Sequence, residues 1–555
     1  MRVGIIDLLG KEPPRNAYSR FMRANNTSVM TQVVAVWCED QGHRVSIAYY
    51  SGWQLLAGGL PDDLDVVFFN SFSQTALVAY AMSARFRAAG IVTVLGGAHA
   101  RSYPEDARRY FDYVVGFCDE KLIRDMLQDL SPSRPLGHCV SASRHPSDLP
   151  GLTRRWKFLL PAMERAPLLR LVPMIGSLGC PYTCSFCVDA EIAYQPLDAE
   201  VLKADLRFFQ KHRLPRSIIV WHDPNFGVRF DDFLGAIEES VRPGSITFLA
   251  ESSLSLLGED HLKRLAENGF KVIAPGIESW FGIGEKAQLR KVTGADKVRR
   301  VAEKVNLIHR YIPYVQCNLI FGLDCDEGPD PFELTKQFID LAPGIFPYFS
   351  VLTCFGRNAP DNLAYQRSGR VLPVPFHFLD LLQAMNVKPK HYGWTEFYDH
   401  LCSVFAHAFS ARAIARRFLV TRTNSVRVEQ LFRALTAERQ NRLRYHSEMR
   451  RWLDEPQMHA FFEGDTREIP PRFTGIIQSH LGPLWHWLPP GALEHDPDAF
   501  AKSITGFGPS VWSSTPAIAA APAPGRPARP AKFRESVSEL DREAQPSTAI
   551  QDTGA

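Results

Sequence analysis

Short apolar runs alternate with amphipathic stretches over the first 130 residues. The runs have the length of buried strands, and they lie at residues 3–7, 45–49, 65–69, 91–95 and 113–115. Apolar positions at helical spacing over 29–40 and 75–89 predict two of the intervening helices. This alternation predicts a parallel, doubly wound sheet, whose ligands bind at the carboxyl ends of the strands. We therefore predict an α/β, Rossmann-like domain over residues 1–130.

A second alternating series covers residues 166–385. Its six apolar runs lie at residues 172–177, 217–222, 246–250, 272–276, 315–321 and 348–353. Helical spacing recurs between them, for example at 199–212 and 295–309. Six strands, each followed by a helix or a loop, predict a barrel or open barrel with its chemistry at the strand carboxyl ends.

The three remaining segments differ from these two series in composition and in the spacing of their apolar residues. Residues 131–165 are rich in Ser, Pro, Arg and His, which predicts a linker between the two domains. Residues 386–510 have helical spacing and many Arg, His, Phe and Trp, and we predict a helical C-terminal region that caps the barrel. Residues 511–555 are mostly Pro, Ala and polar residues, which predicts a disordered tail.

Composition narrows the class of protein. Of the 555 residues 45% are hydrophobic and 22% charged, which is typical of a soluble globular protein. The net charge of +3 favours neither a nucleic-acid nor a membrane-surface partner. No apolar run approaches the roughly 18 residues of a spanning helix, so we expect no membrane span and a cytoplasmic location.

Three cysteines stand close together after the first strand of the second series. The sequence SLGCPYTCSFCVD places Cys180, Cys184 and Cys187 in a CxxxCxxC array. Three thiolates at this spacing can hold one face of an iron–sulfur cube and leave the fourth iron without a protein ligand. A zinc site usually has a second ligand pair, which is not nearby, and a disulfide framework suits small secreted chains. The array therefore indicates a [4Fe-4S] cluster.

This array, with the aromatic Phe186 before its third cysteine, resembles that of the radical S-adenosylmethionine (SAM) enzymes. The resemblance implies an incomplete six-stranded barrel, a partial (β/α)6 fold. It also implies that the open iron chelates the amino and carboxylate groups of SAM. Reduction of the cluster then cleaves SAM to a 5'-deoxyadenosyl radical.

Two further strand ends carry similar signals. The sequence WHDPNFGV resembles a DxNF turn of the cobalamin-dependent class of this family and implies that Asp223 and Asn225 bind cofactor. An Asp-Pro-Asn turn without a ligand is the alternative. Gly276, Glu278 and Ser279 belong to a GIES segment, which resembles the family's segment beside the ribose and methionine of SAM. A structural arginine partner for the glutamate is the alternative here.

The N-terminal domain resembles the cobalamin-binding domain of that class. The resemblance lies in VLGGAHARSYPEDARRYFDYVVGFCDE, with Gly96 and Gly97 at a strand end and Ser71 placed 25 residues before the pair. It implies that these three residues bind cobalamin, although a tight turn is an ordinary cause of a glycine pair. One departure stands out: Leu9 occupies the place of the histidine that ligates cobalt in many cobalamin domains.

These patterns predict a cobalamin-dependent radical SAM methyltransferase that acts on an unactivated carbon. We expect a small-molecule or natural-product-like substrate, an electron donor such as flavodoxin or ferredoxin, and no nucleic acid. Leu9 keeps open a radical SAM enzyme of rearrangement, oxidation or cyclisation with a vestigial cobalamin domain. A non-catalytic iron–sulfur redox protein is the remaining alternative. The sequence leaves the substrate unidentified.

Overall fold

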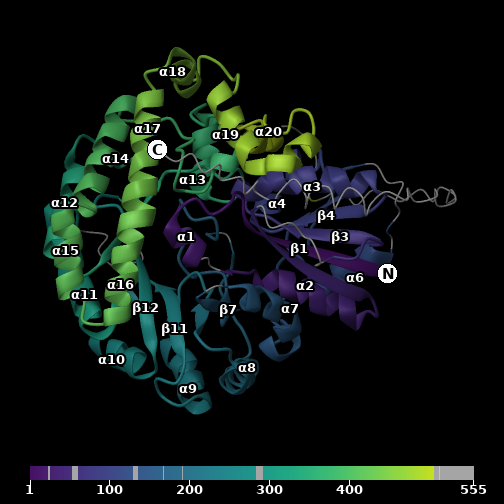
Figure 1. Ribbon diagram of the computed structural model, residues 1–555, viewed down its shortest axis with the longest axis horizontal. Helices are drawn as coiled ribbons and strands as arrows, with labels where there is room; N and C mark the ends of the chain where they lie inside the picture. The colour runs from purple at the N-terminus through teal and green to yellow at the C-terminus, as the bar shows by residue number, and fades with distance from the viewer. Residues whose placement is uncertain are drawn as a thin grey trace, which may run out of the picture.

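A computed structural model of the chain contains two parallel sheets and a helical region (Figure 1). It describes residues 1–22, 25–52, 60–128, 130, 136–166, 168–190, 192–282, 292–505 and 512. The predicted disordered tail, 511–555, lies outside these residues except for Trp512.

The N-terminal sheet has six parallel strands in the order β2-β1-β3-β4-β5-β6. They are β1 (Arg2–Gly10), β2 (Arg44–Ser51), β3 (Val66–Asn70), β4 (Val92–Gly96), β5 (Tyr113–Val115) and β6 (His138–Val140). Ile5 and Phe68 pack toward helices α2 (Val29–Asp40) and α6 (Glu120–Gln128), whereas Ile6 and Val67 belong to the core formed with α3 (Ala76–Ala88). Because both faces of the sheet are covered, the strands are largely apolar, and the predicted doubly wound domain is confirmed.

The second sheet has the order β14-β13-β12-β11-β10-β7, again all parallel. Its strands are β7 (Arg170–Met174), β10 (Ser217–Trp221), β11 (Thr247–Ser252), β12 (Phe270–Glu278), β13 (Tyr314–Phe321) and β14 (Phe346–Val351). The intervening helices are α8 (Ala199–His212), α9 (Phe230–Ser240), α10 (Glu259–Glu267), α11 (Gly294–Tyr311) and α12 (Asp330–Leu341). Within the described residues β7 and β14 form the two edges and do not pair, so the barrel is open, as predicted.

Part of the segment predicted as a linker is regular structure, so this prediction is wrong for residues 138–140 and 152–165. β6 extends the N-terminal sheet, and α7 (Leu152–Arg165) packs on α2. Arg155 donates to Gln32 Oε1 at 2.8 Å, and the Tyr49 hydroxyl donates to the Phe158 carbonyl. The polar composition of the segment concealed an amphipathic helix whose apolar residues pack between the two domains: Phe158 lies in the core with α2, and Trp156 packs against Phe208 of α8.

The C-terminal region is helical, as predicted, and adjoins the open side of the barrel (Figure 1). Its helices are α14 (Trp394–Ala408), α15 (Ala411–Val420), α16 (Asn424–Arg433), the π-helix η4 (Ala434–Leu443), α17 (Arg444–Trp452), α18 (Pro456–Glu463), α19 (Pro471–Leu481) and α20 (Ala499–Thr505). The segments α16, η4 and α17 follow one another without a break and form one long helix. Against it packs the short helix α1 (Ala17–Phe21), which belongs to the connection between β1 and α2. In the part of the chain that is described, no helix is long and apolar enough to cross a membrane.

Candidate active site

The three cysteines lie on the loop that follows β7, at the carboxyl end of the second sheet. Cys180 and Cys184 are buried, and Cys187 is half-buried. Two short antiparallel strands, β8 (Ser177–Leu178) and β9 (Gln195–Pro196), pair across the base of the loop and close it. Gly179 has φ +66°, and a Cβ there would lie 2.3 Å from the Ile192 carbonyl oxygen. Glycine therefore lets the two ends of the cysteine loop approach each other.

The donor set of this loop suits a cluster better than a single ion. Among the described residues, no three His, Cys, Asp or Glu side chains converge so that they could hold one metal ion. In a cubane each cysteine ligates a different iron, so the three sulfurs surround a volume rather than a point. The loop could thus hold three irons of a [4Fe-4S] cluster and leave the fourth for a ligand.

Asp223 anchors the cysteine loop from the neighbouring strand β10. The Gly176 N–H donates to Asp223 Oδ2 at 3.0 Å, and the Ser177 hydroxyl donates to Oδ1 at 2.6 Å. Asp223 is 2% exposed, and this burial raises the pKa of its carboxyl group to about 6. The carboxylate expected to bind cofactor thus makes internal contacts that fix where the loop begins.

Asn225, two residues further on, has a buried side-chain donor that lacks an acceptor among the described residues. Its Oδ1 accepts from the Ser253 N–H at 2.9 Å, which joins β10 to the end of β11. Its Nδ2 is buried without a hydrogen-bond partner among the described residues. A buried donor without an acceptor costs about 1–3 kcal/mol. A ligand oxygen could accept this hydrogen bond, as the predicted cofactor role requires.

The end of β12 presents a carboxylate through an unusual backbone conformation. Glu278 has φ +64° and follows a break in register between Gly276 and itself. A Cβ at Gly276 would lie 2.1 Å from Glu278 Oε1, so the glycine makes room for the carboxylate. Ser279, in contrast, points into the protein, where its hydroxyl donates to Asp326 Oδ1 at 3.1 Å. Of the three residues predicted here, Glu278 reaches the cavity described next.

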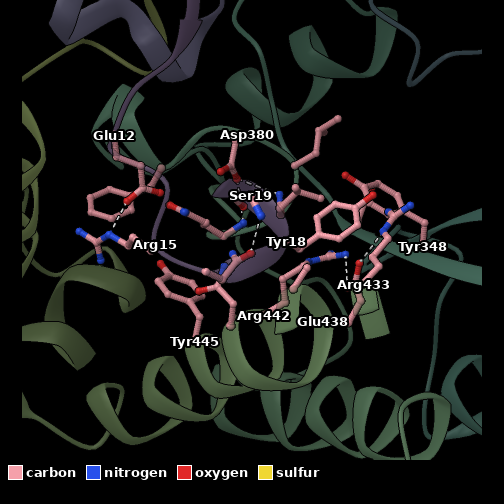
Figure 2. Close-up of a pocket in the computed structure, with 18 of the residues that line it drawn as sticks. Glu12, Arg15, Tyr18, Ser19, Tyr348, Asp380, Arg433, Glu438, Arg442 and Tyr445 are labelled. Carbon is pink, nitrogen blue, oxygen red and sulfur yellow. Dashed lines mark hydrogen bonds and ion pairs between the residues drawn. The ribbon is translucent and has the colours of Figure 1, made fainter. Parts of the chain in front are cut away.

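A cavity of about 1230 Å³, the barrel cavity, lies between the sheet and the long C-terminal helix (Figure 2). The alternation of side chains along parallel strands brings polar residues from four strands to its floor. These are Glu251, Glu278, Gln316, Asn318, Tyr348 and Ser350. Helix α1 forms another wall, with Tyr18 and Ser19 facing the cavity.

A buried ion cluster of Arg433, Glu438 and Arg442, on the long C-terminal helix, forms the adjoining wall. Glu438, 2% exposed, lies 3.4 Å from Arg433 and 2.9 Å from Arg442. Both guanidinium groups also lie over the ring of Tyr348, at 5.4 and 4.9 Å from its centroid. π-Helical turns are rare and occur frequently at functional sites. This wall was missed from the sequence, where the only signal is charge of both signs at helical spacing in an otherwise featureless region.

A smaller cavity of about 230 Å³, the sheet cavity, opens at the carboxyl ends of the N-terminal strands. Gly96 and Gly97 line it, together with apolar residues of β1, β3, β4 and β5. Gly97 has φ +90°, and a Cβ there would meet Asn70 Oδ1 at 2.3 Å. Ser71 is fully buried behind the glycines and accepts the His99 N–H at 2.9 Å through its carbonyl oxygen. Ser71 therefore supports the turn that carries the glycine pair, whereas the glycines themselves line the cavity.

A third cavity, the interdomain cavity of about 540 Å³, joins the N-terminal domain to the cysteine loop. Ser177, Gly179 and Asp189 line it from the loop. Arg101 lines it from the other domain and forms an ion pair with Asp189 at 3.9 Å. Ser28, Met30, Arg101 and His145 line both this cavity and the sheet cavity, so the two adjoin.

Comparison with known proteins agrees with this arrangement. Residues 174–333 match the Radical SAM superfamily, so the predicted radical SAM domain is confirmed; domains of this class use a [4Fe-4S] cluster and SAM. The match begins at the end of β7 and includes the cysteine loop and the ends of β10 and β12.

Two curated relatives come from Chlorobaculum tepidum. Bacteriochlorophyllide d C-12(1)-methyltransferase is 23% identical over 371 residues, which are 64% of this chain and 78% of that protein. Bacteriochlorophyllide d C-8(2)-methyltransferase is 24% identical over 304 residues, or 52% and 66% of the two chains. Among solved structures, the cobalamin-dependent SAM radical enzyme OxsB with aqua-cobalamin bound superposes with a TM-score of 0.50 at 12% identity, covering 88% of this chain and 80% of that one. This likeness shows a shared fold.

Proposed function

We propose that the protein is a cobalamin-dependent radical SAM methyltransferase that transfers a methyl group to an unactivated carbon of a small molecule. Its radical SAM domain supports the radical half of this function. Both curated relatives are methyltransferases, which supports methyl transfer as the outcome. The cobalamin requirement rests on the N-terminal domain.

The observation that carries this proposal is the pair of adjoining cavities between the N-terminal strand ends and the cysteine loop. The apolar sheet cavity could take the nucleotide tail of cobalamin, and the larger interdomain cavity could take the ring. The space beside Gly96 is open to a ligand, because a Cβ built there would meet only the Phe69 carbonyl oxygen within 4 Å, at 3.8 Å. A side chain at Gly96 would occupy the space that a ligand could fill.

Each part of the chain then has a task in the reaction. Cys180, Cys184 and Cys187 would hold the cluster, and Asp223 positions their loop. Asn225 Nδ2 and the Glu278 carboxylate would hold polar groups of SAM. When bound, cluster and SAM supply the radical that abstracts hydrogen, and cobalamin supplies the methyl group. The protein's share is to align these groups and to keep water from the radical.

The size and lining of the barrel cavity bear on the substrate. Ligand pockets commonly measure about 300–1000 Å³, so a cavity of about 1230 Å³ has room for SAM and for a second molecule. A natural-product-like substrate against the wall of Tyr348, Arg433 and Arg442 fits this space. We further propose flavodoxin or ferredoxin as electron donor, a cytoplasmic location and no nucleic-acid partner.

The test is anaerobic reconstitution with iron, sulfide and hydroxocobalamin, followed by desalting and absorption spectroscopy. The unmodified protein should retain cluster and corrinoid bands. Cys184→Ala should lose the cluster, whereas Cys402→Ala, outside the loop, should keep it. Gly96→Leu should keep the cluster and lose corrinoid, while Gly235→Leu, where a Cβ meets nothing within 4 Å, should keep both. Corrinoid retention by Gly96→Leu would contradict the assignment of the sheet cavity.

Leu9 favours a second candidate, a radical SAM enzyme of rearrangement, oxidation or cyclisation with a vestigial cobalamin domain. Leu9 lies in β1 at the place where many cobalamin domains carry their cobalt-ligating histidine. If the unmodified protein retained its cluster and cleaved SAM but bound no corrinoid, this second candidate would replace the first.

A further inference from the structure

His145 stands where the two adjoining cavities of the N-terminal domain meet. It follows β6, in the segment where the sequence predicts only a linker, and it lines both the sheet cavity and the interdomain cavity. If cobalamin binds as proposed, with its tail in one cavity and its ring in the other, a side chain shared by both lies where these two parts of the cofactor join. No other histidine in the described part of the chain lines both cavities.

The hydrogen bonding of His145 suits a metal ligand. Its Nδ1 lies 3.2 Å from the Cys118 carbonyl oxygen and 3.4 Å from the Cys118 backbone nitrogen. These two contacts require opposite tautomers, and the shorter one places the proton on Nδ1, where the carbonyl accepts it. Nε2 then carries the lone pair. Histidines that bind metals usually donate their other ring N–H to a carbonyl or carboxylate in this manner.

Packing supports the same role. The ring stands edge-on to Phe117, with centroids 5.1 Å apart and planes at 90°, which limits its rotation.

We infer that His145 is the cobalt ligand of this protein and replaces the histidine missing at Leu9. When cobalamin is bound, Nε2 would supply the nitrogen ligand to cobalt, in place of the cofactor's own benzimidazole base. The inference rests on the proposed cobalamin binding. It takes the cobalt ligand from the segment after β6, far in sequence from the position of Leu9, where many cobalamin domains carry their histidine. His222 also lines the interdomain cavity, but its Nε2 lies 2.9 Å from Asn26 Oδ1. His222 is therefore the matched control.

The test uses the full chain, reconstituted anaerobically with unlabelled cobalamin, reduced to the cobalt(II) state and measured by electron paramagnetic resonance. A nitrogen ligand to cobalt(II) splits each cobalt line into three for 14N and into two for 15N. Protein grown with 15N-labelled histidine should give two-line splitting. His145→Gln and His145→Ala should lose that splitting while keeping the bound corrinoid, and His222→Ala should retain it.

Each other outcome has a definite meaning. Three-line splitting in the labelled protein would show that the cofactor's own base ligates cobalt, and it would overturn the inference. Absence of nitrogen splitting, or its loss in His222→Ala with retention in His145→Ala, would also overturn it. A chain that binds no corrinoid would overturn the proposed cobalamin requirement as well. Because the labelled, unmodified chain gives the decisive spectrum, the test does not depend on the folding of a variant.

Discussion

Replacing Asp223 with alanine should loosen the cysteine loop. The change removes the acceptor of both the Gly176 N–H and the Ser177 hydroxyl, and all three residues are buried. Each buried donor left without a partner costs about 1–3 kcal/mol, and relief of the buried charge offsets part of the sum. We expect the free energy of unfolding to fall by about 2–4 kcal/mol. Cluster content after reconstitution should fall as well, although Asp223 is not a cluster ligand.

Asparagine at this position gives a sharper test, because it keeps the shape and removes the charge. The pKa of Asp223 is about 6 in the folded protein, against 3.8 as its ordinary value. The folded state therefore binds more protons between these two values, and its stability falls as the pH rises through them. The stabilising contribution of the protonated form is complete below about pH 4 and lost above about pH 6. Asp223→Asn lacks this dependence.

Urea unfolding from pH 4 to pH 7 measures both effects. The free energy of unfolding of the unmodified protein, relative to Asp223→Asn, should fall by on the order of 2–3 kcal/mol over this range. Iron content and SAM cleavage at pH 7 should follow the order unmodified, asparagine, alanine. If Asp223→Ala kept its cluster and unfolded within about 0.5 kcal/mol of the unmodified protein, the anchoring role would be refuted. A difference that does not change with pH would refute the buried-charge argument.

Two further changes test the barrel cavity. Glu438→Gln leaves Arg433 and Arg442 buried without their shared carboxylate, and breaking a buried pair in this way costs about 3–5 kcal/mol. Urea unfolding measures this loss. Gly276→Ala places a methyl group where the Glu278 carboxylate lies, so the affinity for SAM should fall roughly ten-fold. Equilibrium dialysis with SAM measures that change.

Each of these changes has a matched control. Glu448→Gln removes a carboxylate 2.9 Å from Arg444, whose side chain is 76% exposed, so it should cost less than about 1 kcal/mol. An equal loss in both glutamine variants would contradict the buried-cluster argument. Gly235→Ala adds a methyl group that meets nothing within 4 Å, so SAM affinity should not change. Unchanged affinity in Gly276→Ala would show that Glu278 does not hold SAM.

The elements that could be predicted from the sequence are those encoded by local pattern. Strands buried on both faces are largely apolar along their length, and so the runs at 65–69 and 91–95 match β3 and β4 to within one residue. The cysteine spacing is equally local, since three thiolates on one short loop need no distant partner to define a cluster site. The radical SAM domain was predicted from these features and is confirmed.

The tertiary structure decided which side chains meet, because those contacts join positions far apart in the chain. Asp223 accepts a hydrogen bond from Ser177, at the start of the cysteine loop and 46 residues away in sequence. The DxNF turn that contains Asp223 does not indicate this contact. Tyr18 donates to Glu429 across 411 residues, and in this way a connection of the N-terminal domain becomes a wall of the barrel cavity. His145 lies in a polar segment without periodicity, and only the packing of β6 beside β5 brings it to the cavities. Local pattern determined the strands and the cluster, whereas the surroundings of each polar side chain depended on how the two sheets and the long helix pack together.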